Sequence, residues 1–139
     1  MRFVKMHGAG NDFLIVDNRA LSLSEPELSA HALRFCARHT GVGADGLMAV
    51  QPARHGGDYA MLFFNADGSL GEMCGNGARC ICRWGYEHGL AGQTQRVETT
   101  AGLVTGVHID RSRYRVRLND PSVLGARMAR VGDAAYPCR

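Results

Sequence analysis

A cysteine followed by a glycine-rich stretch is the clearest chemical feature of this sequence. Cys74 stands directly before Gly75-Asn76-Gly77, and apolar residues at helical spacing follow. We expect a helix to begin at Gly75 or Asn76, which places the thiol beside unpaired N–H groups and the positive end of the helix. This position favours the thiolate, and the glycines let the same N–H groups close on a carboxylate. The segment thus predicts a base and a carboxylate clamp, although by itself it also fits a structural cysteine beside a helix cap.

Two asparagines stand where strands are expected to begin or end. Asn11 follows the turn Gly8-Ala9-Gly10, and Asn65 closes an apolar run just before Asp67. Their short amides can hydrogen-bond a polar amino acid, and each is equally an ordinary turn residue when taken singly.

The segment 41–46 satisfies the G-x-G-x-x-G pattern of dinucleotide-binding proteins. That motif must follow a strand and open a helix, so that the helix N-terminus meets the pyrophosphate. Here a helix is expected before the segment and a strand after it, so we interpret it as a helix-to-strand loop.

The chain has five cysteines, an odd number that argues against a disulfide framework. Zinc ligands usually come in pairs at C-x₂₋₄-C spacing, whereas Cys80 and Cys82 would lie about 200° apart on one helix. Cys36 and His39 share the apolar face of the expected first helix and are interpreted as core residues. We therefore expect no metal site; the expectation of no cofactor comes from the family resemblance given below.

Composition excludes several classes of protein. The net charge is +3 without a Lys/Arg cluster, which gives no indication of nucleic-acid binding. No apolar stretch approaches the ~18 residues of a membrane helix, and no signal peptide precedes the first strand. The expected location is the cytoplasm, where cysteines are reduced.

Periodicity and turn residues indicate an α+β fold. A capping box at Ser24 and Glu27 predicts a first helix that Gly41 ends, and the second helix is expected to run to about His88. Short turns between strands favour a mixed or antiparallel sheet wrapped around this second, central helix. Residues 1–118 are expected to form one domain, and 119–139 a connector or tail. The expected strands cover residues 3–7, 13–16, 47–50, 59–64, 96–100, 103–109 and 114–118.

Four motifs in order resemble the N-terminal signatures of diaminopimelate epimerases, over residues 1 to about 120. They are residues 5–13 (KMHGAGNDF), 41–46 (GVGADG), 64–69 (FNADGS) and 74–80 (CGNGARC). The resemblance implies one half of the diaminopimelate-epimerase-like fold, in which two similar halves enclose the substrate and each supplies one cysteine, without pyridoxal phosphate or metal.

By motif position, the resemblance implies that Cys74 is the catalytic thiol of the N-terminal half. Asn11 and Asn65 match substrate-binding amides, and Gly75 and Asn76 match the backbone that holds a carboxylate. The implied reaction converts LL-diaminopimelate to meso-diaminopimelate, a precursor of lysine and of the cell wall.

The sequence departs from the family at two points. Some members carry glutamine as a substrate contact where this chain has Gly46. No second Cys-Gly-x-Gly segment occurs in the 139 residues. We therefore expect these residues to lack the C-terminal half of the family. Because inversion of a stereocentre needs two proton-transfer groups, the expected partner is that missing half or a second copy of this chain. The chain alone is then an incomplete isomerase.

Three alternatives stand beside this interpretation. Proline racemase-like enzymes also have a Met-Cys-Gly segment, as in Met73-Cys74-Gly75, but theirs resembles Cys-Gly-His-Gly, whereas this chain has Asn76. Phenazine-biosynthesis-type isomerases share the fold but lack the thiol, so Cys74 argues against them. A binding or assembly module derived from the epimerase half, without catalysis, is the alternative of a different class.

Overall fold

The computed structural model describes residues 1–118, 120, 125 and 127–138. The described strands are β1 (Val4–Gly8), β2 (Asn11–Asp17), β3 (Gly46–Gln51), β4 (Tyr59–Asn65), β5 (Leu70–Gly71), β6 (Thr94–Thr99), β7 (Gly102–Asp110), β8 (Arg113–Arg117), β9 (Arg127–Val131) and β10 (Ala134–Cys138). The described helices are α1 (Asn18–Leu21), α2 (Glu25–Cys36) and α3 (Gly75–Glu87).

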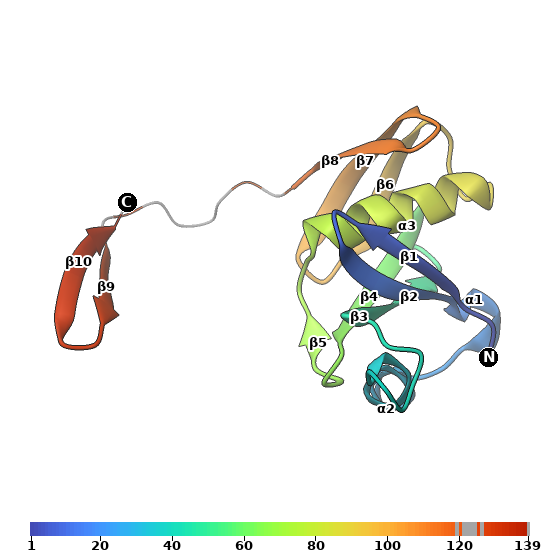
Figure 1. Ribbon diagram of the computed structural model, residues 1–139. Helices are drawn as coiled ribbons and strands as arrows, with labels where there is room; N and C mark the ends of the chain where they lie inside the picture. Colours follow the sequence, from blue (N-terminus) through green and yellow to red (C-terminus); the bar gives the residue numbers. More distant parts are fainter. Residues whose placement is uncertain (119, 121–124, 126, 139) are drawn as a thin grey trace.

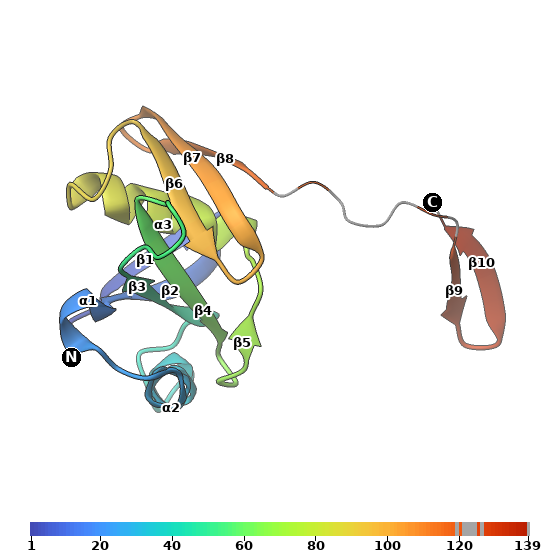
Figure 2. The same cartoon turned by 180° about the vertical axis from the view of Figure 1, so that it is seen from behind.

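Strands β1 to β8 form one mixed sheet that curls around α3 (Figures 1 and 2). Its strand order is β1-β2-β3-β4-β6-β7-β8, with β5 paired to β4. The β2–β3 and β4–β6 pairs are parallel and the other pairs are antiparallel. The predicted α+β fold, with a mixed sheet around the second long helix, is therefore confirmed.

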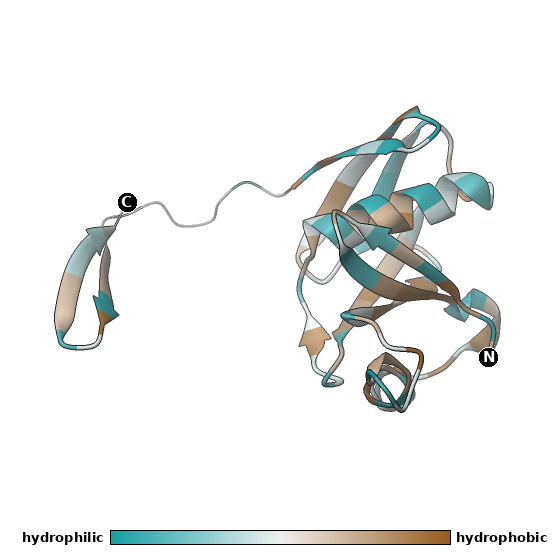
Figure 3. Cartoon of the chain, viewed as in Figure 1, coloured by the Kyte–Doolittle hydropathy of each residue, from teal (hydrophilic) through white to brown (hydrophobic). Residues whose placement is uncertain are grey.

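The central strands are buried on both faces because helices cover both sides of the sheet there. In β3, Met48 and Val50 belong to the core between the sheet and α3, whereas Leu47 and Ala49 pack in the core that contains residues of α2. This explains why β3 is a continuous apolar run instead of an alternating one. Helix α3, in contrast, carries both hydrophilic and hydrophobic residues along its length (Figure 3).

A buried polar contact ties α3 to the sheet. The Tyr59 hydroxyl donates to the side-chain oxygen of Gln95 at 2.6 Å and lies 3.1 Å from the carbonyl oxygen of Ile81 in α3. A Cβ atom on Gly85 would lie 2.5 Å from the Tyr59 hydroxyl oxygen. Glycine at position 85 therefore lets α3 lie directly on the tyrosine.

The first long helix begins as predicted and ends earlier than predicted. The Ser24 backbone N–H donates to Glu27 at 2.8 Å, as the capping box requires. Helix α2 stops at Cys36, not at Gly41, because the chain folds back and the N–H groups of the next loop bond to its last carbonyls. His39 lies beyond the helix, exposed and with φ of 74°, so its placement on the apolar face was wrong.

Several short elements were not predicted. They are α1, β5 and the hairpin of β9 and β10, which lies apart from the eight-stranded sheet in both views (Figures 1 and 2). The hairpin occupies part of the segment 119–139 that was expected to be a connector or tail. Residues 119, 121–124, 126 and 139 of that segment lie outside the described residues. Within the described part of the chain, no helix is long and apolar enough to cross a membrane.

Candidate active site at the start of helix α3

Cys74 is the N-cap residue of α3, as the sequence predicts. Its backbone is extended, with φ of −133° and ψ of 115°, and its carbonyl accepts the first helical hydrogen bond from the Ala78 N–H at 2.8 Å. The N–H groups of residues 75–77 have no carbonyl partner within the helix. The half-buried thiol therefore stands beside a helix end that can bind an anion.

The turn between β1 and β2 lies against this helix end. Ala9 and Gly10, its two central residues, both have positive φ (54° and 87°), which is typical of a type I′ hairpin. A Cβ atom on Gly8 would lie 2.7 Å from the backbone oxygen of Asn76. Glycine at position 8 thus permits a contact between backbones that brings Asn11 to the start of α3.

Three of the sequence-predicted site residues meet at this contact. The Cys74 thiol donates to the side-chain oxygen of Asn11 at 3.5 Å. The side-chain amide of Asn76 donates to the same oxygen at 3.4 Å. Cys74 and Asn11, which are 63 residues apart in the sequence, are thereby in direct contact.

Charged residues stand at both ends of this hydrogen-bond chain. Arg79, on the first turn of α3, donates to the side-chain oxygen of Asn76. At the other end, the side-chain amide of Asn11 donates to Asp45 at 2.5 Å. Arginine can only donate and an ionised carboxylate can only accept, so the two ends specify which way both carboxamides point.

Asp45 belongs to an acidic pair with cationic partners. The hydrogen bond from Asn11 is the main cause that lowers its pKa, followed by the bond from the Asp12 backbone, and Arg38 adds to the effect. Arg38 lies 2.8 Å from Asp45 and 3.1 Å from Asp12. Asp45 is therefore ionised near neutral pH.

Asn65 lies in the turn after β4 and is not hydrogen-bonded to the other site residues. Its side-chain amide donates to the hydroxyl of Ser69 at 2.9 Å. It is linked to the site through the backbone, because Ala66 donates to the carbonyl of Asp45 at 3.2 Å and Asn65 is the register partner of Gly46. The structure thus brings together Cys74, Asn11, Gly75 and Asn76, with Asn65 one loop away.

The three other cysteines with described side chains are buried in the core. Burial raises the pKa of Cys36 and of Cys80 to about 11, and that of Cys82 to about 12. They are therefore protonated thiols near neutral pH. Within the described residues, no group of three or more His, Cys, Asp or Glu side chains could hold a metal ion.

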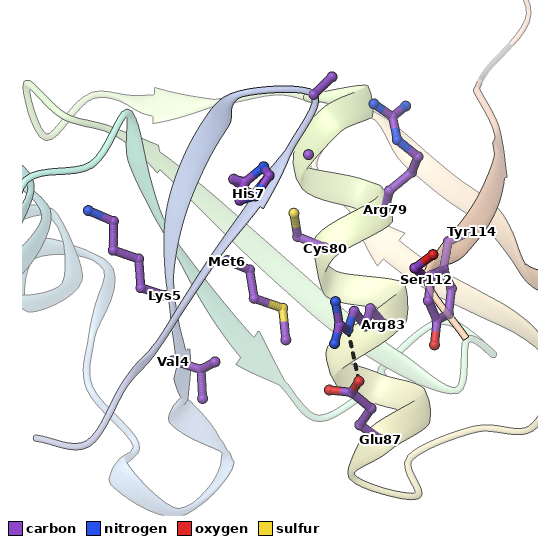
Figure 4. Close-up of a pocket in the computed structure, with 12 residues that line it drawn as sticks. Val4, Lys5, Met6, His7, Arg79, Cys80, Arg83, Glu87, Ser112 and Tyr114 are labelled. Atoms are coloured by element: carbon purple, nitrogen blue, oxygen red, sulfur yellow. Dashed lines mark hydrogen bonds and ion pairs between the residues drawn. The ribbon is translucent and has the colours of Figure 1, made fainter. Parts of the chain in front are cut away.

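A groove of about 700 Å³ lies between β1 and α3 (Figure 4). Lys5 and His7 line it from the strand, and Arg79, Arg83 and Glu87 from the helix. Arg83 is bonded to Glu87 at 2.8 Å, as the dashed line in Figure 4 marks. Cys74 is not among the residues that line it, so the groove adjoins the proposed thiol site through Arg79 and does not contain it.

Reasoning from the sequence missed Asp45 and Arg79 as partners of the site. Asp45 lies in the segment 41–46. The glycines of this segment were tested as a dinucleotide-binding pattern, and the carboxylate of Asp45 was not predicted to belong to the site. Arg79 follows Asn76 by three residues, the spacing at which helical side chains meet, and this spacing could have indicated the contact.

The arrangement of sheet and central helix defines a fold class that includes amino-acid racemases. A probable proline racemase from Agrobacterium radiobacter superposes with a TM-score of 0.62 at 19% identity, over 82% of this chain and 40% of the other. A phenazine biosynthesis protein from Bacillus anthracis gives 0.61 at 22% identity, over 84% and 40%. At such identities the likeness establishes the fold alone.

The sequence defines the family more closely. The diaminopimelate epimerase profile matches residues 3–124. Diaminopimelate epimerases from Caldanaerobacter subterraneus and Aquifex aeolicus are 48% and 42% identical, over 75% and 88% of this chain. The chain therefore belongs to the diaminopimelate epimerase family. It spans less than half the length of these relatives, 36% and 47%.

Proposed function

We propose that this chain supplies one half-site of a cofactor-independent, two-base epimerase that converts LL-diaminopimelate to meso-diaminopimelate. Cys74 is the acid/base thiol of this half-site. The observation that carries the proposal is the position of Cys74 at the start of α3 and in contact with Asn11, within a chain of the diaminopimelate epimerase family.

The geometry supports a division of labour at the helix end. The free N–H groups of Gly75 and Asn76 bind the α-carboxylate of the substrate, which also stabilises the negative charge that develops when the α-proton leaves. The Cys74 thiolate takes that proton and becomes a thiol, and in the reverse direction the thiol returns it. Asn11 and Asn65 bind the polar groups of the substrate.

Inversion requires a second group on the opposite face of the α-carbon. Cys80 and Cys82 lie along the same helix as Cys74 and are buried, so they cannot occupy that face. Cys36 is also buried, and the side chain of Cys138 lies outside the described residues. We propose that the second thiol comes from another polypeptide segment, either the C-terminal half of an epimerase or a second copy of this chain. The chain spans 36–49% of the length of its relatives, which is compatible with a half-site.

The test measures conversion of LL- to meso-diaminopimelate with a coupled meso-specific dehydrogenase. The purified chain is compared with the chain mixed with a separately expressed C-terminal half of a related epimerase. We expect no useful turnover from the chain alone, because loss of one proton-transfer group costs about 10²–10⁴-fold. Turnover should appear on mixing. Turnover of the chain alone at the rate of an intact epimerase would refute the half-site proposal.

A further inference from the structure

The loop 41–46 has a dinucleotide-like glycine pattern and no role in the reaction proposed above. Its N–H groups do not face an open site, because those of Val42 and Gly43 donate to the carbonyl of Phe35 at 2.9 and 3.1 Å. A phosphate would find these donors already bonded. The loop instead directs one charged side chain, Asp45, toward the proposed active site.

Both carboxylate oxygens of Asp45 have partners. One oxygen accepts from the side-chain amide of Asn11 at 2.5 Å and from the backbone N–H of Asp12 at 3.1 Å. The other accepts from Arg38 at 2.8 Å. The backbone N–H of Asp45 donates to the carbonyl of Asp12 at 2.9 Å, so the loop is fixed to β2 through main chain and side chain.

A carboxamide has a donor at one end and an acceptor at the other, so its orientation matters chemically. The ionised Asp45 accepts hydrogen bonds and cannot donate them, so the nitrogen of Asn11 faces it and the oxygen faces Cys74. The reversed carboxamide would place its oxygen against a carboxylate. It would also present an N–H group to the sulfur and so favour the thiolate over the thiol.

We infer that Asp45 is a positioning residue of the proposed active site, which holds the Asn11 carboxamide with its oxygen toward Cys74 so that the thiol proton has a fixed acceptor. The inference rests on the proposed function for its place in catalysis, but the contact itself is tested without turnover. Asp45 acts through Asn11 and does not touch the sulfur.

The first test is Asp45→Asn in the intact chain, which keeps the size of the side chain and removes the carboxylate that requires a donor from Asn11. Only the Asn76 amide then still favours the original orientation of the Asn11 carboxamide. We expect iodoacetamide to alkylate Cys74 near neutral pH about three- to tenfold faster than in the wild type. A hydrogen bond from the Asn11 N–H to the thiolate would change the rate by more than this if the reversed orientation were fully populated. The matched control is Asp58→Asn. Asp58 accepts the Arg96 backbone N–H at 2.6 Å and lies just before β4, at the end opposite Asn65, so its loss should leave the rate unchanged.

Removing a negative charge near a thiol also favours the thiolate. The effect of the Asp45 charge on the alkylation rate must therefore be separated from the effect of the Asn11 orientation. In an Asn11→Ala background there is no carboxamide to orient, and Asp45→Asn should then accelerate alkylation less than threefold. An acceleration of threefold or more in that background, or one below threefold in the wild-type background, would overturn the positioning role.

A second measurement uses the unaltered chain and does not depend on how the variants fold. The Asn11 amide and the Asp12 backbone N–H donate to the same oxygen of Asp45, so their protons lie close together. We expect a nuclear Overhauser effect between them, and its absence would refute the assigned orientation. These readouts do not involve epimerisation, so a failure of the proposed function is distinguishable from a failure of this inference.

Discussion

Replacing Gly8 with alanine tests whether the β1–β2 turn and the start of α3 are as close as the site requires. Gly8 is not in the left-handed region, so alanine fits its backbone and the new methyl group is the main perturbation. That methyl group would lie 2.7 Å from the Asn76 carbonyl oxygen, 3.3 Å from its carbonyl carbon and 3.4 Å from its Cα. These are backbone atoms, so a rotamer change cannot relieve the contact.

The magnitude follows from the distance that must be regained. Ordinary van der Waals contact begins at 3.4 Å, so the turn and the helix end must separate by about 0.7 Å. Overpacking of this kind costs about 1–3 kcal/mol of unfolding free energy. The same shift lengthens the contacts of Asn11 with Cys74 and Asn76, now 3.5 and 3.4 Å, beyond hydrogen-bonding distance.

The assay is urea unfolding of Gly8→Ala beside Gly92→Ala, whose Cβ would meet no atom within 4 Å. We expect the Gly92 variant to stay within about 0.5 kcal/mol of the wild type. When the chain is mixed with a C-terminal half of a related epimerase, Gly8→Ala should lower turnover on the order of ten- to a hundredfold, because small misplacements of reacting groups slow the reaction strongly. Equal stability of the Gly8 variant and the wild type would refute the close approach of the two backbones.

Three further predictions concern the thiols, a buried carboxylate and the buried tyrosine. Limiting iodoacetamide near neutral pH should label Cys74 before the three buried cysteines, and peptide mapping that finds them labelled first would contradict this. Glu98 accepts three backbone N–H groups of the 54–57 loop, which lower its pKa, so its stabilising effect is present above about pH 4.5 and is lost as the pH falls through the lowered value. Glu98→Gln should therefore be less stable at neutral pH in urea unfolding and lose less stability on acidification; equal pH dependence would count against it. Tyr59→Phe leaves the buried oxygen of Gln95 without its 2.6 Å partner and should cost about 1–3 kcal/mol, and no loss would disprove this role.

Local patterns in the sequence were sufficient for the long elements and for the position of Cys74. The start of α3 could be predicted because Gly75-Asn76-Gly77 and the apolar spacing after it are local signals. The end of α2 could not be predicted from local signals. The N–H groups that bond to the Phe35 carbonyl come from a loop whose path depends on β3, so the glycine signal at Gly41 placed the helix end too late.

The composition of the site shows the same limit. Asn11 was identified from its turn and from the family resemblance, but its contact with Cys74 spans 63 residues and depends on how the sheet curls. Asp45 was missed because its role is visible only once the Asn11 carboxamide lies against it. The β9–β10 hairpin was missed because Arg127–Val131 lacks the apolar alternation of a strand with one buried face.

The central claim is that Cys74 moves the α-proton of the substrate. The most direct measurement is incorporation of solvent deuterium at the α-carbon during inversion of LL-diaminopimelate in heavy water, with the chain mixed with a C-terminal half. Cys74→Ala is compared with Cys80→Ala, which removes a buried thiol from the same helix. The account predicts that Cys74→Ala lowers incorporation into the inverted product about 10²–10⁴-fold, whereas Cys80→Ala retains it. Incorporation by Cys74→Ala at the wild-type rate would contradict the account.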